Sequence, residues 1–183
     1  MITTDTLRKI LIANELGGDT TLVYKFSPPC SDGSGWTFGV CQFDVRTNPE
    51  ALQCLRNCGF TSEEVRIVHE DDGDVEALTP KLVPRVIDQW DNKELQSCID
   101  TPKKLCDSAG IEFADDEAFY HLADYHNQFH MAPGGKMDKF LQSLGRPVAA
   151  QDILKLKLST RWGQGHAPDV YRRYNNIHRI CAV

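Results

Sequence analysis

The chain has 183 residues, the length of one ordinary domain, and is long enough to bury a sizeable core. Its net charge of −6 argues against nucleic acid as a partner, because phosphate binding needs a basic surface. It contains no apolar run of the roughly 18 residues that suggest a membrane span. The N-terminal segment MITTDTLRKILIANELGG lacks the basic start and apolar stretch of a secretory signal. We therefore expect a protein made in the cytoplasm without a signal peptide.

The seven cysteines are an odd number, so at least one thiol is unpaired within a monomer. Without an export signal we expect reduced, buried thiols, although delivery to an oxidising compartment would allow disulfides. Cys54 and Cys58 lie one helical turn apart, but no CxxC pair accompanies them. Core packing is therefore favoured over a zinc site for this pair, and we expect no cofactor.

The first part of the chain predicts one helix followed by a small β-lobe. Residues 4–16 show helical apolar spacing with Thr4 as the candidate cap, and the glycines at 17 and 18 end the helix. Residues 20–27 (TTLVYKFS) are β-branched and aromatic, which predicts a strand, and the prolines at 28 and 29 stop it. A turn at 31–35 then leads to a second strand or irregular buried run at 36–44.

From residue 47 onward the pattern is helical. Asn48 and Pro49 are the cap and first-turn proline of one helix, and Thr61 and Glu64 have capping-box spacing for the next. Residues 72–78 read as a loop. Further helices are predicted at 80–90, 92–108, 115–131, 136–144, 150–158 and 168–178. These elements predict an α+β fold in a single domain of residues 1–183, with a β-lobe at about 19–45 and a helical lobe at about 47–183.

Three residues near the N-terminus have the side chains that cleavage of a glycosidic bond requires. An inverting hydrolase uses one carboxylic acid to protonate the leaving oxygen and one carboxylate to activate water, about 6.5–9.5 Å apart. Glu15 ends an apolar helical pattern, where partial desolvation favours the protonated form. Asp32 lies in a Gly/Ser turn that favours the ionised form, and the Thr37 hydroxyl could hold the attacking water.

This segment resembles the catalytic region of chitosanases of the lysozyme-like superfamily. In that family a catalytic Glu near the end of the first helix is followed by a strand with a Tyr and by a GDGxGYTxG turn. The matching residues here are Glu15, Tyr24 and SDGSGWTFG, with Trp36 in place of the motif's aromatic Tyr. The resemblance implies a lysozyme-like fold and inversion, with Glu15 as general acid, Asp32 as general base and Thr37 as the water-positioning residue. Tyr24 and Trp36 are expected to contact substrate.

The resemblance covers the catalytic segment and stops there. Ser31 replaces the glycine before Asp32, and the PPC segment at 28–30 is also unlike the family. The superfamily includes phage endolysins and other muramidases, in which a similar hairpin carries a G-x-x-Q strand. By that resemblance, Gln42 in GWTFGVCQFD would line the cleft beside the scissile sugar. An exposed strand residue is the alternative interpretation for Gln42.

The C-terminal third offers a second group of substrate-binding candidates. In the segment LSTRWGQGHAPDVYRRYNNI, Trp162 could stack on a sugar face, and Arg161, Arg172 or Arg173 could meet a carboxylate or lactyl group. A loop followed by an amphipathic helix is the alternative.

Two possible metal sites are not favoured. His126 and His130 lie one turn apart but lack the HExxH glutamate, so we favour a polar helix face over a metal site. The aspartates at 71, 72 and 74 do not fit calcium-loop spacing and predict a solvated loop.

We expect a bacteriolytic, peptidoglycan-cleaving muramidase (lysozyme) that works as a phage endolysin or as an antimicrobial effector at the bacterial cell wall or periplasm after delivery. Its expected partners are peptidoglycan glycan strands, together with an immunity or inhibitor protein or a delivery machinery. A chitosanase acting on the cationic polymer chitosan is the second hypothesis, and the acidic composition favours it. A non-catalytic glycan-binding or inhibitor module is the third.

Overall fold

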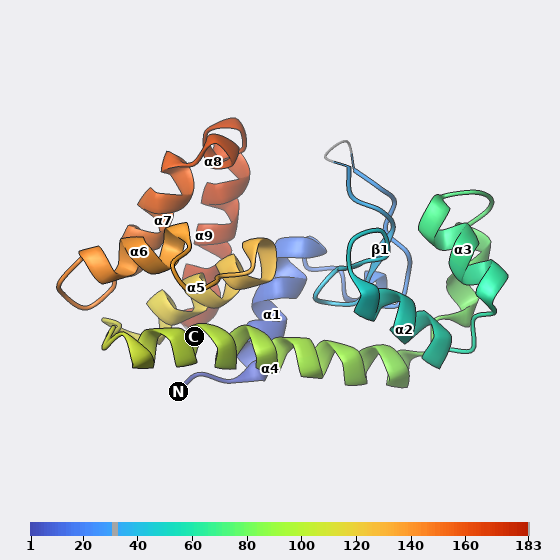
Figure 1. Cartoon of the computed structure of the whole chain (residues 1–183), viewed down its shortest axis with the longest axis horizontal. Helices are drawn as coiled ribbons and strands as arrows, with labels where there is room; N and C mark the ends of the chain where they lie inside the picture. Colours follow the sequence, from blue (N-terminus) through green and yellow to red (C-terminus); the bar gives the residue numbers. More distant parts are fainter. Residues whose placement is uncertain (31–32, 183) are drawn as a thin grey trace. The chain divides into compact units, whose positions relative to one another are not determined.

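The computed structural model describes residues 1–30 and 33–182 and is mostly helical, with one small antiparallel sheet. Figure 1 follows the elements along the chain. They are α1 (Thr4–Glu15), a 3₁₀ helix η1 (Thr20–Leu22), β1 (Thr37–Phe38), β2 (Phe43–Asp44), α2 (Pro49–Asn57), α3 (Ser62–Glu70), a 3₁₀ helix η2 (Glu76–Lys81), α4 (Pro84–Ser108), α5 (Asp116–Phe129), α6 (Lys136–Ser143), α7 (Ala150–Ser159), α8 (Arg161–Gly165) and α9 (Ala167–Cys181). The α+β class is confirmed at this level.

Two compact units divide the chain, and each is described by itself. The first unit contains residues 1–14 and 95–183, and the second contains residues 15–94. The unit around the hairpin is therefore larger than the predicted β-lobe of 19–45, because α2 packs against β2 and against α3. The helices α2 and α3, assigned by sequence to the helical lobe, belong with the hairpin.

Aromatic packing builds the core of the second unit. Phe26 meets the rings of Trp36, Phe38 and Phe60 edge-on, with centroid distances of 5.8–6.4 Å. Phe38 and Phe43 face each other across the hairpin, whose register pairs Thr37 with Asp44 and Phe38 with Phe43. The hairpin thus carries one aromatic face into the core.

The predicted strand at 20–27 is wrong. Residues 20–22 form η1, capped by the Asp19 side chain, and turns follow up to an isolated bridge between Ser27 and Thr37. Val23 accepts a hydrogen bond from the Gly39 backbone, so this segment packs on the hairpin without extending alongside it. Local β-propensity is a weak signal against such long-range contacts.

The helices at 80–90 and 92–108 were also predicted wrongly as separate elements, because α4 is one continuous helix from Pro84. No glycine or proline interrupts it before Pro102. The predicted loop at 72–78 is partly wrong, since η2 begins at Glu76.

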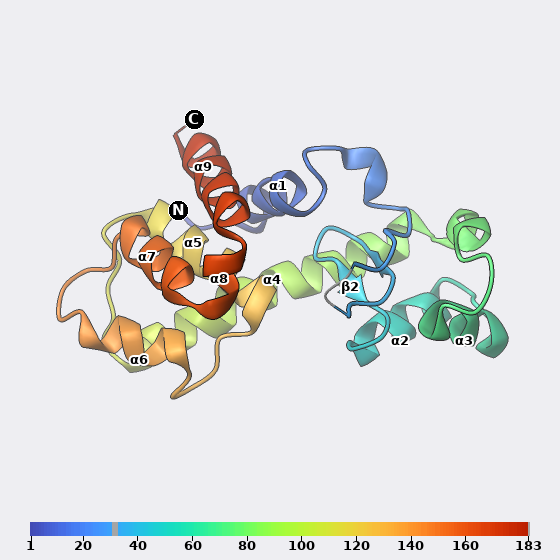
Figure 2. The same cartoon turned by 90° about the horizontal axis from the view of Figure 1, so that it is seen from above.

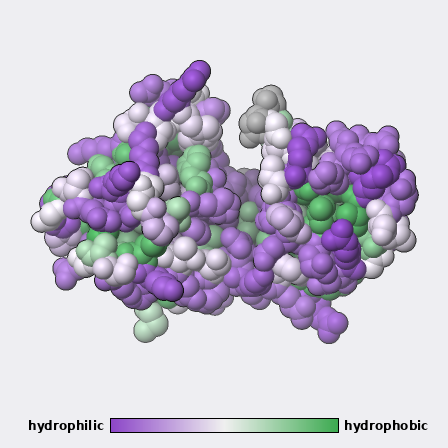
Figure 3. Space-filling view, viewed as in Figure 1, coloured by the Kyte–Doolittle hydropathy of each residue, from purple (hydrophilic) through white to green (hydrophobic). Residues whose placement is uncertain are grey.

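In the first unit, α5, α7 and α9 pack against one another, as the two views in Figures 1 and 2 both show. A buried apolar cluster joins α4 to α5, α6 and α7; it contains Cys106, Leu122, Met131, Met137, Leu141, Val148, Ile153 and Leu156. On the face drawn in Figure 3, hydrophilic residues cover most of the surface of each unit. Within residues 1–30 and 33–182, every helix is too short or too polar to cross a membrane.

Candidate active site

Glu15 is the last residue of α1, where the sequence predicted the general acid. Its side chain is half-buried. The helix ends there because Gly17 has a φ of +61°, a left-handed conformation that glycine adopts without strain. Asp19 then caps η1 by accepting a hydrogen bond from the Thr21 backbone at 2.9 Å. A carboxylic acid is thus placed between a helix end and a tightly turning segment.

Thr37 and Gln42, predicted separately, are brought into direct contact by the hairpin. The Thr37 hydroxyl donates to Oε1 of Gln42 at 2.6 Å, and Nε2 of Gln42 donates to the Gly39 carbonyl at 2.8 Å. Gln42 has a φ of +54°, which is uncommon for a residue with a side chain. Because the only hydroxyl proton of Thr37 points to Gln42, its oxygen lone pairs remain the atoms that can accept from a water.

A buried carboxylate that sequence reasoning missed holds the turn of this hairpin. Asp91 on α4 is 0 % exposed and accepts hydrogen bonds from the backbone of Val40 at 2.9 Å and of Cys41 at 3.1 Å. Gly39 has a φ of +77°, and a Cβ there would lie 2.8 Å from the Asp91 carboxylate. The sequence contained a signal for the burial of Asp91. This residue lies four positions from Ile87 and from Leu95, on the apolar face of the helix.

Asp32, the predicted general base, lies outside the described residues. The segment that follows it is tied to β2 and to the residues after it. The Gly35 backbone donates to Asp44 at 3.1 Å, and the Arg46 guanidinium donates to the Gly33 carbonyl at 3.1 Å. These contacts fix residues 33–35 against the hairpin that carries Thr37.

Tyr24 and Trp36, predicted to contact substrate, make hydrogen bonds within the second unit. The Tyr24 hydroxyl donates to Asp88 of α4, with distances of 3.0 and 3.2 Å to the two carboxylate oxygens. The Trp36 indole N–H donates to Asp71 at 2.7 Å, and Trp36 is 9 % exposed. Because so little of the Trp36 ring is exposed, packing within the unit is a better supported role for it than stacking on a sugar.

Arg161 and Trp162 belong to the first unit, on α8. Arg161 is exposed. Trp162 is half-buried, stacks on His166 with ring centroids 4.6 Å apart and meets Phe129 edge-on at 5.1 Å. Trp162 therefore lies in an aromatic group at the surface of this unit, an arrangement able to contact the face of a sugar ring.

No group of three His, Cys, Asp or Glu side chains that could hold a metal ion is found among residues 1–30 and 33–182. His126 and His130 meet edge-to-face with ring centroids 5.8 Å apart, and burial lowers the pKa of His126 to about 4. The aspartates at 71, 72 and 74 are exposed, and Asp72 pairs with Arg66.

All seven cysteines are free thiols, and Cys54 is fully buried. The expectation of buried thiols is wrong for Cys30, which is exposed, and for Cys58 and Cys181, which are half-buried. The Cys54 thiol donates toward Cys58, which lowers the pKa of Cys58 below its usual value.

No family model matches the sequence, and comparisons with curated proteins and with solved structures found no match.

Proposed function

We propose that the chain is an inverting glycoside hydrolase that cleaves the β-1,4 links of peptidoglycan, a muramidase. Glu15 acts as the general acid, Asp32 as the general base, and Thr37 positions the attacking water. The observation that carries the proposal is the 2.6 Å hydrogen bond from Thr37 to Gln42 on a hairpin held by the buried Asp91. It gives the Thr37 hydroxyl one orientation, which a water-positioning residue needs before the reaction begins.

The other parts of the proposal agree with this role. Glu15 opens the compact unit that contains the hairpin, and it ends a helix, a rigid element on which to hold an acid. Gln42 supports Thr37 from within the turn, so its expected contact with the scissile sugar becomes a supporting role under this proposal. The proposed reaction is acid/base cleavage by Glu15, Asp32 and Thr37, and the proposal assigns no role to a metal.

A chitosanase is the second candidate, because the SDGSGWTFG turn resembles that family most directly and the net charge of −6 suits a cationic polymer. The two activities differ in substrate and share the same catalytic roles. A catalytically silent glycan-binding module on the same framework is distinguished from both by binding without hydrolysis.

Mass spectrometry of a digest of purified peptidoglycan tests the proposal, because it reports the bond cut and the product type together. We expect muropeptides that end in intact amino sugars, and NMR of fresh product should show the inverted anomer. A parallel digest of chitosan identifies the second candidate.

Glu15→Gln should abolish hydrolysis, whereas Glu76→Gln, an exposed acid in the same unit, should leave it unchanged. Full activity of Glu15→Gln would show that the general acid lies elsewhere. Binding of either polymer without any release of product would contradict both hydrolase proposals and favour the glycan-binding module.

A further inference from the structure

The first unit contains a small aromatic pocket that the proposed hydrolytic residues do not use. Its volume is about 150 Å³, and it is lined by Tyr125 and Phe129 of α5, Lys157 of α7, Thr160, and Trp162 of α8. The ring centroids of Tyr125 and Phe129, and those of Phe129 and Trp162, are each 5.1 Å apart. Phe129 is 38 % exposed, so the wall it forms is reached by solvent. A cavity of about this size holds one benzene-sized group.

Lys157, one of the residues that line this apolar space, carries a buried ammonium group. Lys157 is 6 % exposed, and its Nζ donates to Gln128 at 2.8 Å and to Asp124 at 3.2 Å. An ammonium carries three hydrogens. Those two contacts use two of them, and within the described part of the chain no acceptor is found for the third.

The environment of Lys157 favours the arrival of an anion. Its carboxylate partner Asp124 is shared with Arg173, which approaches the same Oδ2 atom at 3.3 Å. Burial lowers the pKa of Lys157 because it disfavours the charged form. A second carboxylate placed beside Nζ would stabilise the ammonium and accept its third hydrogen in a site with few competing waters.

We propose that this pocket binds a compact carboxylate ligand, with the carboxylate on Lys157 and a one-ring or branched apolar body between Phe129, Tyr125 and Trp162. The residues of this pocket all lie in the first unit, whereas Glu15 and Thr37 belong to the second. Carboxylate binding is therefore tested without hydrolysis, and only the glycan source named next rests on the proposed function. Two sources offer this chemistry: a free small organic acid, or the lactyl side chain of N-acetylmuramic acid in a glycan strand.

The deciding measurement is a titration of the full chain with benzoate and with its neutral analogue benzamide, followed by ¹H–¹⁵N NMR shifts and calorimetry. We expect benzoate to bind at least tenfold more tightly than benzamide. Equal affinities, or no binding of benzoate, would overturn the proposal. This comparison uses the wild-type protein and therefore does not depend on the folding of any variant.

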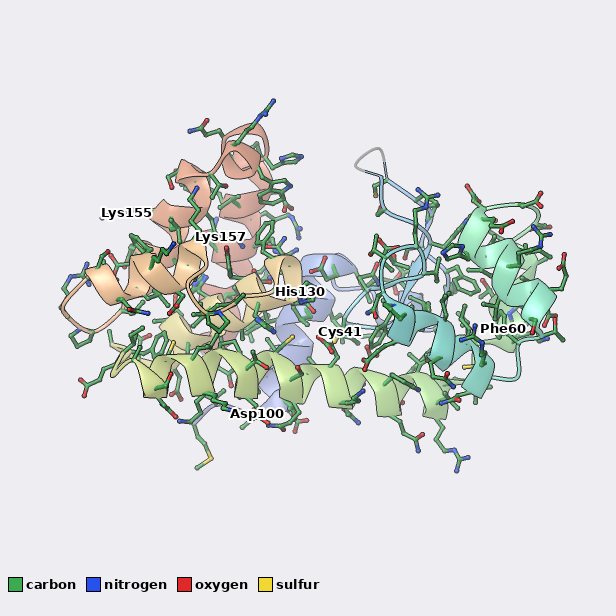
Figure 4. All side chains as sticks on the ribbon, in the orientation of Figure 1. Cys41, Phe60, Asp100, His130, Lys155 and Lys157 are labelled. Atoms are coloured by element: carbon green, nitrogen blue, oxygen red, sulfur yellow. The ribbon has the colours of Figure 1, made fainter. Side chains whose placement is uncertain are left out.

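Two lysines of α7 provide a matched pair of variants. Lys157→Met should lose the preference for benzoate, while Lys155→Met, at an exposed position two residues earlier, should keep it (Figure 4). Phe129→Ala removes an exposed wall of the pocket and should weaken benzoate binding severalfold even if Lys157→Met fails to fold. A folded Lys157→Met protein that still prefers benzoate would overturn the role of the ammonium.

A second pair of ligands distinguishes the sources. Tighter binding of N-acetylmuramic acid than of N-acetylglucosamine, which lacks the lactyl group, would assign the carboxylate to the glycan. Benzoate binding without that difference would assign it to a free small acid. Both results support the pocket, because in each case the carboxylate determines the affinity.

Discussion

Asp124 and Arg173 form an almost fully buried ion pair in which the guanidinium reaches both carboxylate oxygens, at 2.6 Å from Nη2 to Oδ1 and 3.3 Å from Nε to Oδ2. Asn14 of α1 also donates to Oδ1, at 2.9 Å. One carboxylate of α5 therefore joins α1 and α9. Burial alone would raise the pKa of Asp124, but the charges of Arg173 and Lys157 outweigh it and hold that pKa far below its usual range.

Replacing this carboxylate should be costly. Asp124→Asn leaves two cations without their anionic partner, and breaking a buried ion pair in this way typically costs about 3–5 kcal/mol of unfolding free energy. Urea denaturation measures the loss. Asp169→Asn removes the exposed partner of Arg172 on the same α9 and should cost under about 1 kcal/mol. Similar losses for the two variants would mean that burial does not strengthen the Asp124 interactions.

Acidification should destabilise the first unit through His121. Burial lowers the pKa of His121 to about 4, although the charges of Asp124 and Glu117 act to raise it, and the ring stacks on Tyr174 with centroids 4.6 Å apart. The unfolded state, with an ordinary pKa of about 6.5, binds the proton more readily. The stability that neutral His121 contributes is therefore complete above pH 6.5 and is lost as the pH falls toward 4.

At about 1.4 kcal/mol per pKa unit, this loss amounts to about 3 kcal/mol. His121→Phe keeps a ring against Tyr174 and should flatten the fall in unfolding free energy between pH 6.5 and 4. His166→Gln, at an exposed histidine, should leave the wild-type slope. If the unfolding free energy of His121→Phe falls with pH as steeply as that of the wild type, His121 is not the cause of the loss of stability.

Removing the carboxylate that holds the hairpin turn should loosen the candidate active site. Val40 and Cys41 donate to different oxygens of Asp91, so Asp91→Asn keeps an acceptor for one backbone N–H and turns an NH₂ donor toward the other. Leaving that one buried donor unsatisfied costs about 1–3 kcal/mol. Hydrogen exchange of the Val40 and Cys41 amides should accelerate in step with the loss of stability. Asp100→Asn, an exposed position of the same α4 (Figure 4), is the control.

Thr37 offers a test of the water-positioning role that separates it from packing. Thr37→Val has nearly the same shape and lacks the hydroxyl, so we expect kcat on the hydrolysed polymer to fall about 100-fold or more with the fold intact. Thr37→Ser retains the hydroxyl and should recover most of that activity. An active Thr37→Val enzyme would remove Thr37 from the mechanism.

Short-range signals in the sequence predicted the caps of α2 and α3. Asn48 caps α2 by accepting from the Glu50 backbone, and Pro49 is the first residue of that helix. Thr61 and Glu64 form the predicted capping box at the start of α3. Both predictions are confirmed, because each cap is a hydrogen bond between residues two or three positions apart. The predicted cap of the first helix was wrong, because Thr4 is the first residue of α1 and the Thr3 hydroxyl accepts from the Thr6 backbone in its place.

The predicted strand at 20–27 is wrong because contacts with distant residues, and not local ones, decide the structure of this segment. Its Val23 and Tyr24 are held by Gly39 and by Asp88, which lie far along the chain, and these contacts outweigh the local preference for extended structure. Thr37 and Gln42 were both chosen from the motif, yet their hydrogen bond depends on the left-handed backbone of Gln42, which residue types alone do not indicate.

The sequence by itself determined the helical class, the caps of α2 and α3, and an acidic residue at the end of the first helix beside a Gly-rich turn. Only the tertiary structure decided which charges are buried. Asp91 lies about 50 residues from the backbone groups it holds, and Asp124 lies 49 residues from Arg173. A carboxylate is stable in such a place only when donors from distant elements surround it, and that condition is met by the packing of the folded chain.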